Sequence, residues 1–353
     1  MSVIVPSYTY TYIKIDFLKQ LIIDNETLKK LRLIDDIREF INFIRPYYPG
    51  IKIYKFEIEE IEKELYHTFF KLIGKIISFS PFNMRLFLKN YLLKYEIINI
   101  KKIILGLIIG LSKKERAERI NFFIEELIGN VQFINRLLDC TSLDEVQVVI
   151  KNTKYYKAIR EGIIYFINYN DTFVLEAFLD QLYYLAMEKE EQSYTQAEKQ
   201  ILTMYVNSII EIYNLNVIYR GILNNIDKKL LSQFLVKKFL FLDDFSTEKL
   251  LNQNNIDDFI STLDNVFKRN KNVKKFYALG GINKEHVYWS IEAIYISNFF
   301  SLLKYKIDDI EYSTIFKIIE IIINKQKEIQ FDVLPNVVKI IHKKFQILEE
   351  GVK

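Results

Sequence analysis

One short pattern occurs three times along the chain, and this repetition constrains the fold more than any other feature. Glu-Ile-x-Asn followed by Ile or Leu occurs at Glu96–Ile100 and again at Glu211–Leu215, 115 residues later. A weaker third copy begins at Glu328, after a further 117 residues. In the first two copies a glycine follows ten residues after the glutamate, at Gly106 and Gly221. Self-similarity at a fixed period indicates a chain built from repeated structural units.

Two further groups of residues recur in the same order and at nearly the same period. The first is an acidic pair that follows an apolar residue, at Asp35-Asp36, Asp144-Glu145 and Asp257-Asp258. The second is a glutamate that precedes an aromatic pair by seven residues, at Glu62, Glu176 and Glu292. Successive copies are 109 to 116 residues apart. Together these groups predict a triplicated chain with helical repeats at 1–116, 117–228 and 229–353.

The composition favours helices over strands. The 353 residues include only 10 glycines and 5 prolines, so turns are few and the elements between them are long. Half of the residues are hydrophobic and 27% are charged, which excludes a disordered chain. Leu65, Phe69 and Leu72 follow Glu62 at the spacing of one helix face. We therefore predict an all-α fold without a sheet.

Charge, cysteine content and hydropathy exclude several classes of protein. The net charge of +4 is too small to argue for nucleic-acid binding by itself. The single Cys140 excludes a disulfide framework and is typical of a small buried hydrophobe. No uncharged run is longer than about a dozen residues, whereas a membrane-spanning helix needs about 20 apolar residues. The start of the sequence does not resemble a secretory signal, and we expect a soluble chain.

No arrangement of residues typical of an active site occurs in the sequence. The segment 280–284 lacks the spacing of a phosphate-binding loop, although it contains two glycines and a lysine. His67, His286 and His342 are far apart in sequence, and one cysteine cannot complete a zinc site. We therefore predict no catalytic residue, no cofactor and no metal. An enzyme with a site concealed between its domains is the less favoured alternative.

The repeated Glu62, Glu176 and Glu292 have two interpretations. Paired carboxylates catalyse hydrolysis when they are held a few ångströms apart, but these three occupy the same place in three separate repeats. We favour a role in which each satisfies a backbone or basic partner between helices. The basic segment 268–275 is either a solvated loop or a contact for an acidic partner or anionic lipid.

Asn99 and Asn214 are predicted to cap helices. Asparagine is unfavourable inside a helix, but its side-chain oxygen accepts a backbone N–H at a helix start. On this prediction one helix ends just before each asparagine and another begins just after it. Gly106 and Gly221 lie seven residues further on, where a missing side chain would let a neighbouring helix come close.

The stretches Glu96–Lys101 and Glu211–Leu215 also carry a resemblance to a known family. The family pattern is an acidic residue, two residues, Asn with Ile or Leu, a lysine-rich turn and an arginine, which is Arg220 in the second copy. The sequence resembles the C subunit of archaeal A-type rotary ATPases, which is related to the d subunit of vacuolar-type ATPases. It departs from the family pattern at three places, Leu105, Phe331 and Val337.

The resemblance implies a non-catalytic protein whose three similar helical domains form a funnel around a pseudo-threefold axis. Its partners would be the central axle subunits and the proteolipid ring of a rotary ATPase, in a hetero-oligomeric complex without nucleic acid. The chain would be cytoplasmic, held at the membrane surface through the ring, and would couple rotation of axle and ring. The sequence does not indicate whether the coupling ion is a proton or sodium.

A helical scaffold for another protein or for RNA is the alternative function. Solenoid repeats that bind such partners are about 20–47 residues long. The period near 115 residues in this chain is much longer, which argues against a solenoid. Co-purification with the other subunits of a rotary ATPase would decide between the two functions.

Overall fold

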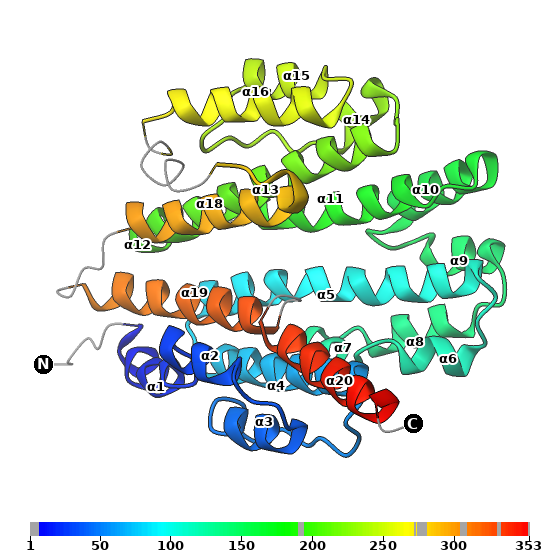
Figure 1. Ribbon diagram of the computed structural model, residues 1–353. Coiled ribbons are helices and arrows are strands. Elements are labelled where there is room, and N and C mark those ends of the chain that lie inside the picture. The colour runs from blue at the N-terminus through cyan, green and yellow to red at the C-terminus, as the bar shows by residue number, and fades with distance from the viewer. Residues whose placement is uncertain are drawn as a thin grey trace, which may run out of the picture. The chain divides into compact units, whose positions relative to one another are not determined.

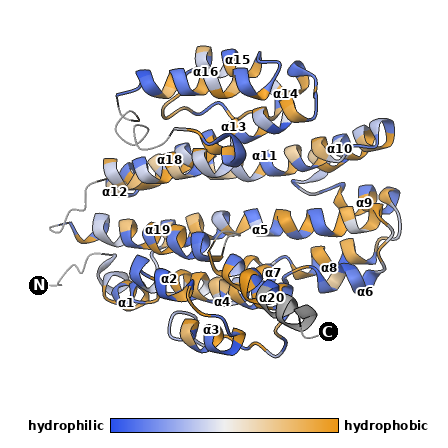
Figure 2. Cartoon of the chain, viewed as in Figure 1, coloured by the Kyte–Doolittle hydropathy of each residue, from blue (hydrophilic) through white to orange (hydrophobic). Residues whose placement is uncertain are grey.

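The fold is all-helical, as the composition predicts. The computed structural model describes residues 7–189, 194–271, 273, 281–303, 309–329 and 333–351, with side chains of the last helix described up to residue 343. Within these ranges every regular element is a helix and no strand occurs (Figure 1). Apolar and polar residues alternate around most of the helices (Figure 2), which is the pattern of helices packed around cores.

The helices divide into three successive groups along the chain. The first group is α1 (Thr9–Lys19), α2 (Asn25–Leu31), α3 (Ile37–Ile44), α4 (Ile58–Phe79) and α5 (Phe82–Ile108). The second is α6 (Lys113–Glu118), α7 (Phe122–Ile128), α8 (Val131–Asp139), α9 (Leu143–Ile150), α10 (Tyr156–Tyr169), α11 (Phe173–Lys189), α12 (Gln196–Glu198), the π-helical turn Lys199–Thr203 and α13 (Met204–Leu223). The third is α14 (Lys228–Phe234), α15 (Asp244–Leu251), α16 (Ile256–Arg269), the 3₁₀ turn Lys284–His286, α18 (Val287–Leu302), α19 (Ile310–Ile329) and α20 (Leu334–Gly351).

Two of the repeated residue groups fall at corresponding places in these helices. The acidic pairs lie at the starts of α3, α9 and α16, where Asp36, Ser142 and Asn255 are the N-caps and accept backbone N–H groups. Acidic residues in a first turn also face the positive end of the helix dipole. Glu62, Glu176 and Glu292 lie in the first two turns of α4, α11 and α18. The division into repeats at 1–116, 117–228 and 229–353 stays a prediction.

The chain forms two compact units. Unit 1 contains residues 1–89, 121–127 and 306–353, and unit 2 contains residues 90–120 and 128–305. Both ends of the chain therefore belong to unit 1. Each unit has a core of its own.

The core of unit 1 is built around α19. This helix packs against α1 and α4, and α20 packs against α3 and α4. Ile315, Ile318, Ile319 and Ile322 recur at the spacing of one helix face and are at most 1% exposed. Each such side chain contributes about 1.5–3 kcal/mol when it is buried. The C-terminal helices thus complete a core that the N-terminal helices begin.

The core of unit 2 is built around α13, which packs against α11, α14, α16 and α18 (Figure 1). Apolar side chains are buried on several sides of α13, including Val206, Ile210, Leu215 and Ile218. With α12 and the π-helical turn it forms one continuous helix, Gln196–Leu223. Among the described residues this is the one helix long and apolar enough to cross a membrane. Its most apolar window is 67% buried inside the protein, as is typical of a core helix.

Candidate functional site

Three buried glutamates occupy equivalent places in the repeated pattern. Glu96 of α5 and Glu211 of α13 are fully buried, and Glu328 of α19 is 3% exposed. A buried carboxylate is costly unless it is paired or hydrogen-bonded. The contacts of these three side chains therefore show the structural role of the repeated pattern.

Glu211 binds a stretch of backbone in unit 2. Its carboxylate accepts N–H groups from Leu240, Phe241 and Leu242 at 2.7–3.0 Å. The hydroxyl of Tyr295 donates to it at 2.7 Å. Burial raises the pKa of Glu211, and these four donors act against that rise. The bound stretch ends at the residue before Asp243, the N-cap of α15.

Glu96 binds the start of a different helix, also in unit 2. The side-chain amide of Asn130 donates to Glu96 Oε1 at 2.5 Å. Asn130 is the N-cap residue of α8. Lys154 Nζ lies 3.6 Å from the second carboxylate oxygen. Glu96 thus accepts one hydrogen bond, and its second oxygen lies near a cation but accepts no hydrogen bond from a described residue.

Glu328 binds the beginning of the chain within unit 1. It accepts the backbone N–H of Ile23 and the hydroxyl of Tyr48, each at 2.8 Å. Lys325, one turn earlier on α19, donates to it at 2.7 Å. Ile23 precedes Asp24, the N-cap of α2. Burial raises the pKa of Glu328 and lowers the pKa of Lys325, while their mutual attraction opposes both shifts.

The three glutamates form a closed series of links. On the predicted division into repeats at 1–116, 117–228 and 229–353, Glu96 of the first repeat binds the start of α8 in the second, and Glu211 of the second binds the segment before α15 in the third. Glu328 in the third binds the segment before α2 in the first. The N-terminal end of a helix carries a partial positive charge, so a carboxylate there is favourable. We call these three contacts the inter-repeat links.

Asn214 does not cap a helix, so the capping prediction is wrong. The helices α5 and α13 continue through Asn99 and Asn214 without a break. Asn214 is 2% exposed, and its side chain exchanges two hydrogen bonds with the backbone of Val236, at 2.8 and 2.9 Å. Asn99 is equally buried in the middle of α5. Tertiary hydrogen bonding thus outweighs the low helix propensity of asparagine at position 214.

Gly106 and Gly221 each lie against the residue ten positions further along the chain. A Cβ on Gly106 would come within 2.8 Å of Arg116 Cγ, and a Cβ on Gly221 within 2.4 Å of the Leu231 methyl groups. Both distances are too short for a real side chain. The missing side chains therefore leave room for α6 and α14 to pack against the helices before them.

The structure brings Glu176 and Arg220 together. Arg220 of α13 lies 3.4 Å from the carboxylate of Glu176 on α11, and its guanidinium stacks over the ring of Phe173 with 5.2 Å to the centroid. The Arg220 side chain is 45% exposed. An ion pair with this exposure contributes little to stability.

Glu62 and Glu292 have different surroundings. Glu62 is partly buried on α4, where burial and this carboxylate raise the pKa of Tyr66. Glu292 is partly buried on α18, and its charge opposes the burial that lowers the pKa of Lys94. Glu62, Glu176 and Glu292 therefore act on different neighbours, Tyr66, Arg220 and Lys94.

Two sequence predictions fall partly outside the described residues. In the basic segment 268–275, residues 272, 274 and 275 lie outside them, while Lys268 lies in the last turn of α16, 3.9 Å from Asp264. In the third copy of the pattern, Phe331 lies outside them and Val337 lies in α20. Within the described part of the chain, no group of three or more His, Cys, Asp or Glu residues could hold a metal ion.

The helices and the inter-repeat links define an all-helical protein whose repeated buried carboxylates join segments distant in sequence. The sequence model of the ATP synthase (C/AC39) subunit family matches residues 14–330, so the chain belongs to this family.

Its relatives include the C subunit of A-type ATP synthase from three organisms. The protein of Methanocaldococcus jannaschii is 26% identical over 206 residues, which are 58% of this chain and 50% of the relative. That of Pyrococcus furiosus is 22% identical over 232 residues, 65% of this chain and 60% of the relative. That of Methanothermobacter thermautotrophicus is 23% identical over 250 residues, which are 69% of this chain and 62% of the relative. The chain thus spans between half and two thirds of the length of these relatives.

Proposed function

We propose that the chain is a non-catalytic central-stalk subunit of an A-type ATP synthase, where it couples the central axle to the membrane proteolipid ring. The observation that carries this proposal is the family match over residues 14–330. The names of the relatives, each a C subunit of an A-type ATP synthase, support the same complex. The proposal includes a place at the cytoplasmic membrane surface and the three-domain funnel that the resemblance implies.

The inter-repeat links support a mechanical role. Moving one elementary charge across 100 mV supplies about 2.3 kcal/mol, and a coupling element must transmit several such steps without deforming. Glu211 and Glu328 each accept hydrogen bonds from a segment distant in sequence, in place of water. Buried polar groups with satisfied hydrogen bonds stiffen a core. The links therefore suit a subunit that passes torque between two partners.

Reconstitution of the A-type ATP synthase from the organism that encodes this chain tests the proposal. ATP hydrolysis and ATP-driven ion uptake would be measured in proteoliposomes with and without the chain. We expect hydrolysis without ion uptake when the chain is omitted, and recovery of uptake when it is added back. Normal uptake in its absence would overturn the proposal. Capture of RNA or an unrelated protein instead of the ATP synthase subunits would favour a scaffold.

A further inference from the structure

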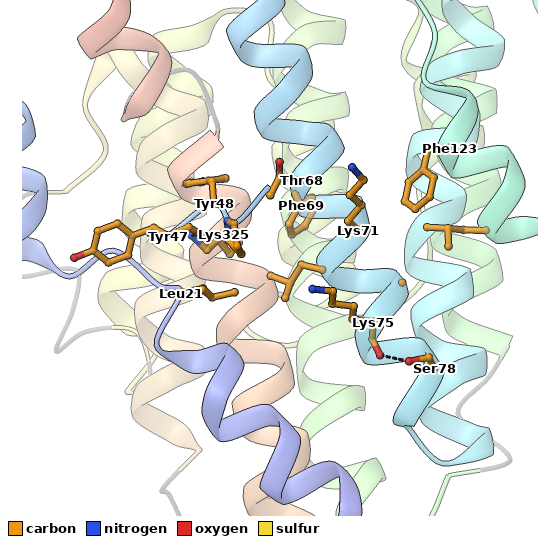
Figure 3. A pocket seen from close by; sticks show the side chains of 14 residues that line it. Leu21, Tyr47, Tyr48, Thr68, Phe69, Lys71, Lys75, Ser78, Phe123 and Lys325 are labelled. Atoms are coloured by element: carbon orange, nitrogen blue, oxygen red, sulfur yellow. Dashed lines mark hydrogen bonds between the residues drawn. The ribbon is translucent and has the colours of Figure 1, made fainter. Parts of the chain in front are cut away.

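A pocket of about 420 Å³ opens along α4 in unit 1. Figure 3 shows Lys71, Lys75 and Ser78 on this helix, with Tyr48 and Leu21 to one side of them and Phe123 to the other. Gly74 lets α7 approach α4, since a Cβ there would lie 3.1 Å from Leu127 Cδ2. The volume lies within the range of about 300–1,000 Å³ that is typical of small-molecule sites.

Most of the pocket wall is apolar. Phe69 and Leu72 of α4 are buried at its base, and Phe123 and Leu127 of α7 form one side. Several polar groups in the wall already have partners within the protein. The hydroxyls of Thr68 and Ser78 donate to carbonyl groups of α4, and Lys325 is bound to Glu328. Those three groups have little capacity left for a ligand.

Lys71 and Lys75 differ from the other polar groups of the pocket. They lie one turn apart on α4, and both are exposed. Neither forms an ion pair with another described residue, and no Asp or Glu lies among the residues that line the pocket. The mouth of an apolar pocket thus carries two lysines that form no ion pair with a described residue.

We propose that this pocket binds an anionic amphiphile, a single alkyl chain with a carboxylate or phosphate head. The alkyl chain lies against Phe69, Leu72, Phe123 and Leu127, and the head group lies between the ammonium groups of Lys71 and Lys75. A nucleotide fits less well, because its base and ribose need several hydrogen-bonding partners and this wall is largely apolar. The proposal does not depend on the function proposed above.

Calorimetric titration of the intact chain with three ten-carbon probes tests the proposal. The probes are decanoate, decyl phosphate and uncharged 1-decanol, each below its aggregation concentration. We expect both anions to bind about tenfold more tightly than decanol, because partly exposed ion pairs add only modestly to affinity. Preference for decanoate would identify a fatty acid, and preference for decyl phosphate a single-chain phosphate amphiphile. Equal affinity for the three probes would overturn the proposal.

Two pairs of lysine substitutions locate the site. The double variant Lys71→Gln with Lys75→Gln should lose the tenfold preference for the anions while its affinity for decanol stays unchanged. The matched control is Lys55→Gln with Lys63→Gln, two exposed lysines that do not line the pocket. The same loss in both double variants would mean non-specific charge attraction and would contradict the place of the head group between Lys71 and Lys75.

A lysine footprint tests the site in the unmodified protein. Acetylation by a soluble active ester would be followed by mass spectrometry with and without saturating decanoate. Acetylation should slow at Lys71 and Lys75 and stay unchanged at Lys55 and Lys63. Protection elsewhere, without protection at Lys71 and Lys75, would overturn the proposed place of the head group.

Discussion

At the scale of single residues, Glu211 accepts hydrogen bonds from more donors than the other two glutamates of the links. Four donors converge on its buried carboxylate. Glu211→Ala leaves these donors buried without an acceptor, so we expect the free energy of unfolding to fall by about 3–5 kcal/mol. Glu211→Gln should cost less, because its carbonyl oxygen still accepts. Urea denaturation of both variants measures the difference.

Glu176→Ala is the matched control for this prediction. It removes a carboxylate of the same unit whose contact with Arg220 is partly exposed. We expect it to cost at most about 1 kcal/mol. A similar loss in Glu176→Ala and Glu211→Ala would mean that the buried hydrogen bonds are not what stabilises this region.

The raised pKa of Glu211 predicts a dependence of stability on pH. Burial makes the folded protein hold this proton more tightly than the unfolded chain, in which the pKa is near 4.5. The contribution of Glu211 to stability is therefore fully present below pH 4.5 and is lost as the pH rises through the folded pKa. We expect the stability difference between wild type and Glu211→Gln, measured from pH 4 upward, to decrease as the pH rises from 4.5 through the folded pKa. A difference that grows with pH would contradict the raised pKa.

The contact between Asn214 and Val236 predicts a different order of melting temperatures for the variants of Asn214 from the capping hypothesis. Its side chain both donates to and accepts from the backbone of Val236. Asn214→Asp keeps the acceptor but places a buried carboxylate oxygen against the Val236 carbonyl. We therefore expect Asn214→Asp to lower the melting temperature at least as much as Asn214→Ala does. A helix cap would give the reverse order, because aspartate caps well.

At the scale of elements, Gly221 determines how closely α14 packs on α13. A Cβ at this position would lie 2.4 Å from the methyl groups of Leu231. Alanine favours a helix over glycine by about 1 kcal/mol, but the clash should outweigh this gain, and we expect a net loss of about 1–3 kcal/mol. Thermal unfolding of Gly221→Ala tests this, and the part of the loss due to the clash should be absent when Gly221→Ala is made in a Leu231→Ala background and compared with Leu231→Ala alone. A gain in stability from Gly221→Ala would show that α14 moves away at no cost.

The helices could largely be predicted from the sequence, but most contacts between them could not. Few glycines and prolines and the helical spacing of apolar residues are local signals, and so is the repeated Glu-x-x-Asn pattern. Tyr295 is 84 residues from Glu211 and Ile23 is 305 residues from Glu328. No local spacing indicates such partners, because they depend on how the helices pack. The same reason explains why the sequence predicts a helix end at Asn214, where the structure has a buried contact with the backbone of Val236.

At the scale of the whole molecule, the two ends of the chain depend on each other. Unit 1 combines residues 1–89 with residues 306–353. The helix α19 lies against α1 and α4, and the third inter-repeat link joins Glu328 to Ile23 and Tyr48. Unit 2 contains no residue beyond Tyr305. The stability of the first helices should therefore depend on the last ones.

Removing the last helices tests this dependence. The four buried isoleucines of α19 alone contribute about 6–12 kcal/mol by burial, comparable with the total stability of a domain. A chain that ends at Leu303 should therefore lose the hydrogen-exchange protection of α1 and α4 and retain that of α13 and α18. Glu328→Ala in the intact chain is the milder control, because it breaks the link and leaves the apolar contacts in place. Protection of α4 that survives the truncation, or an equal loss in α13, would contradict the mutual dependence of the two chain ends.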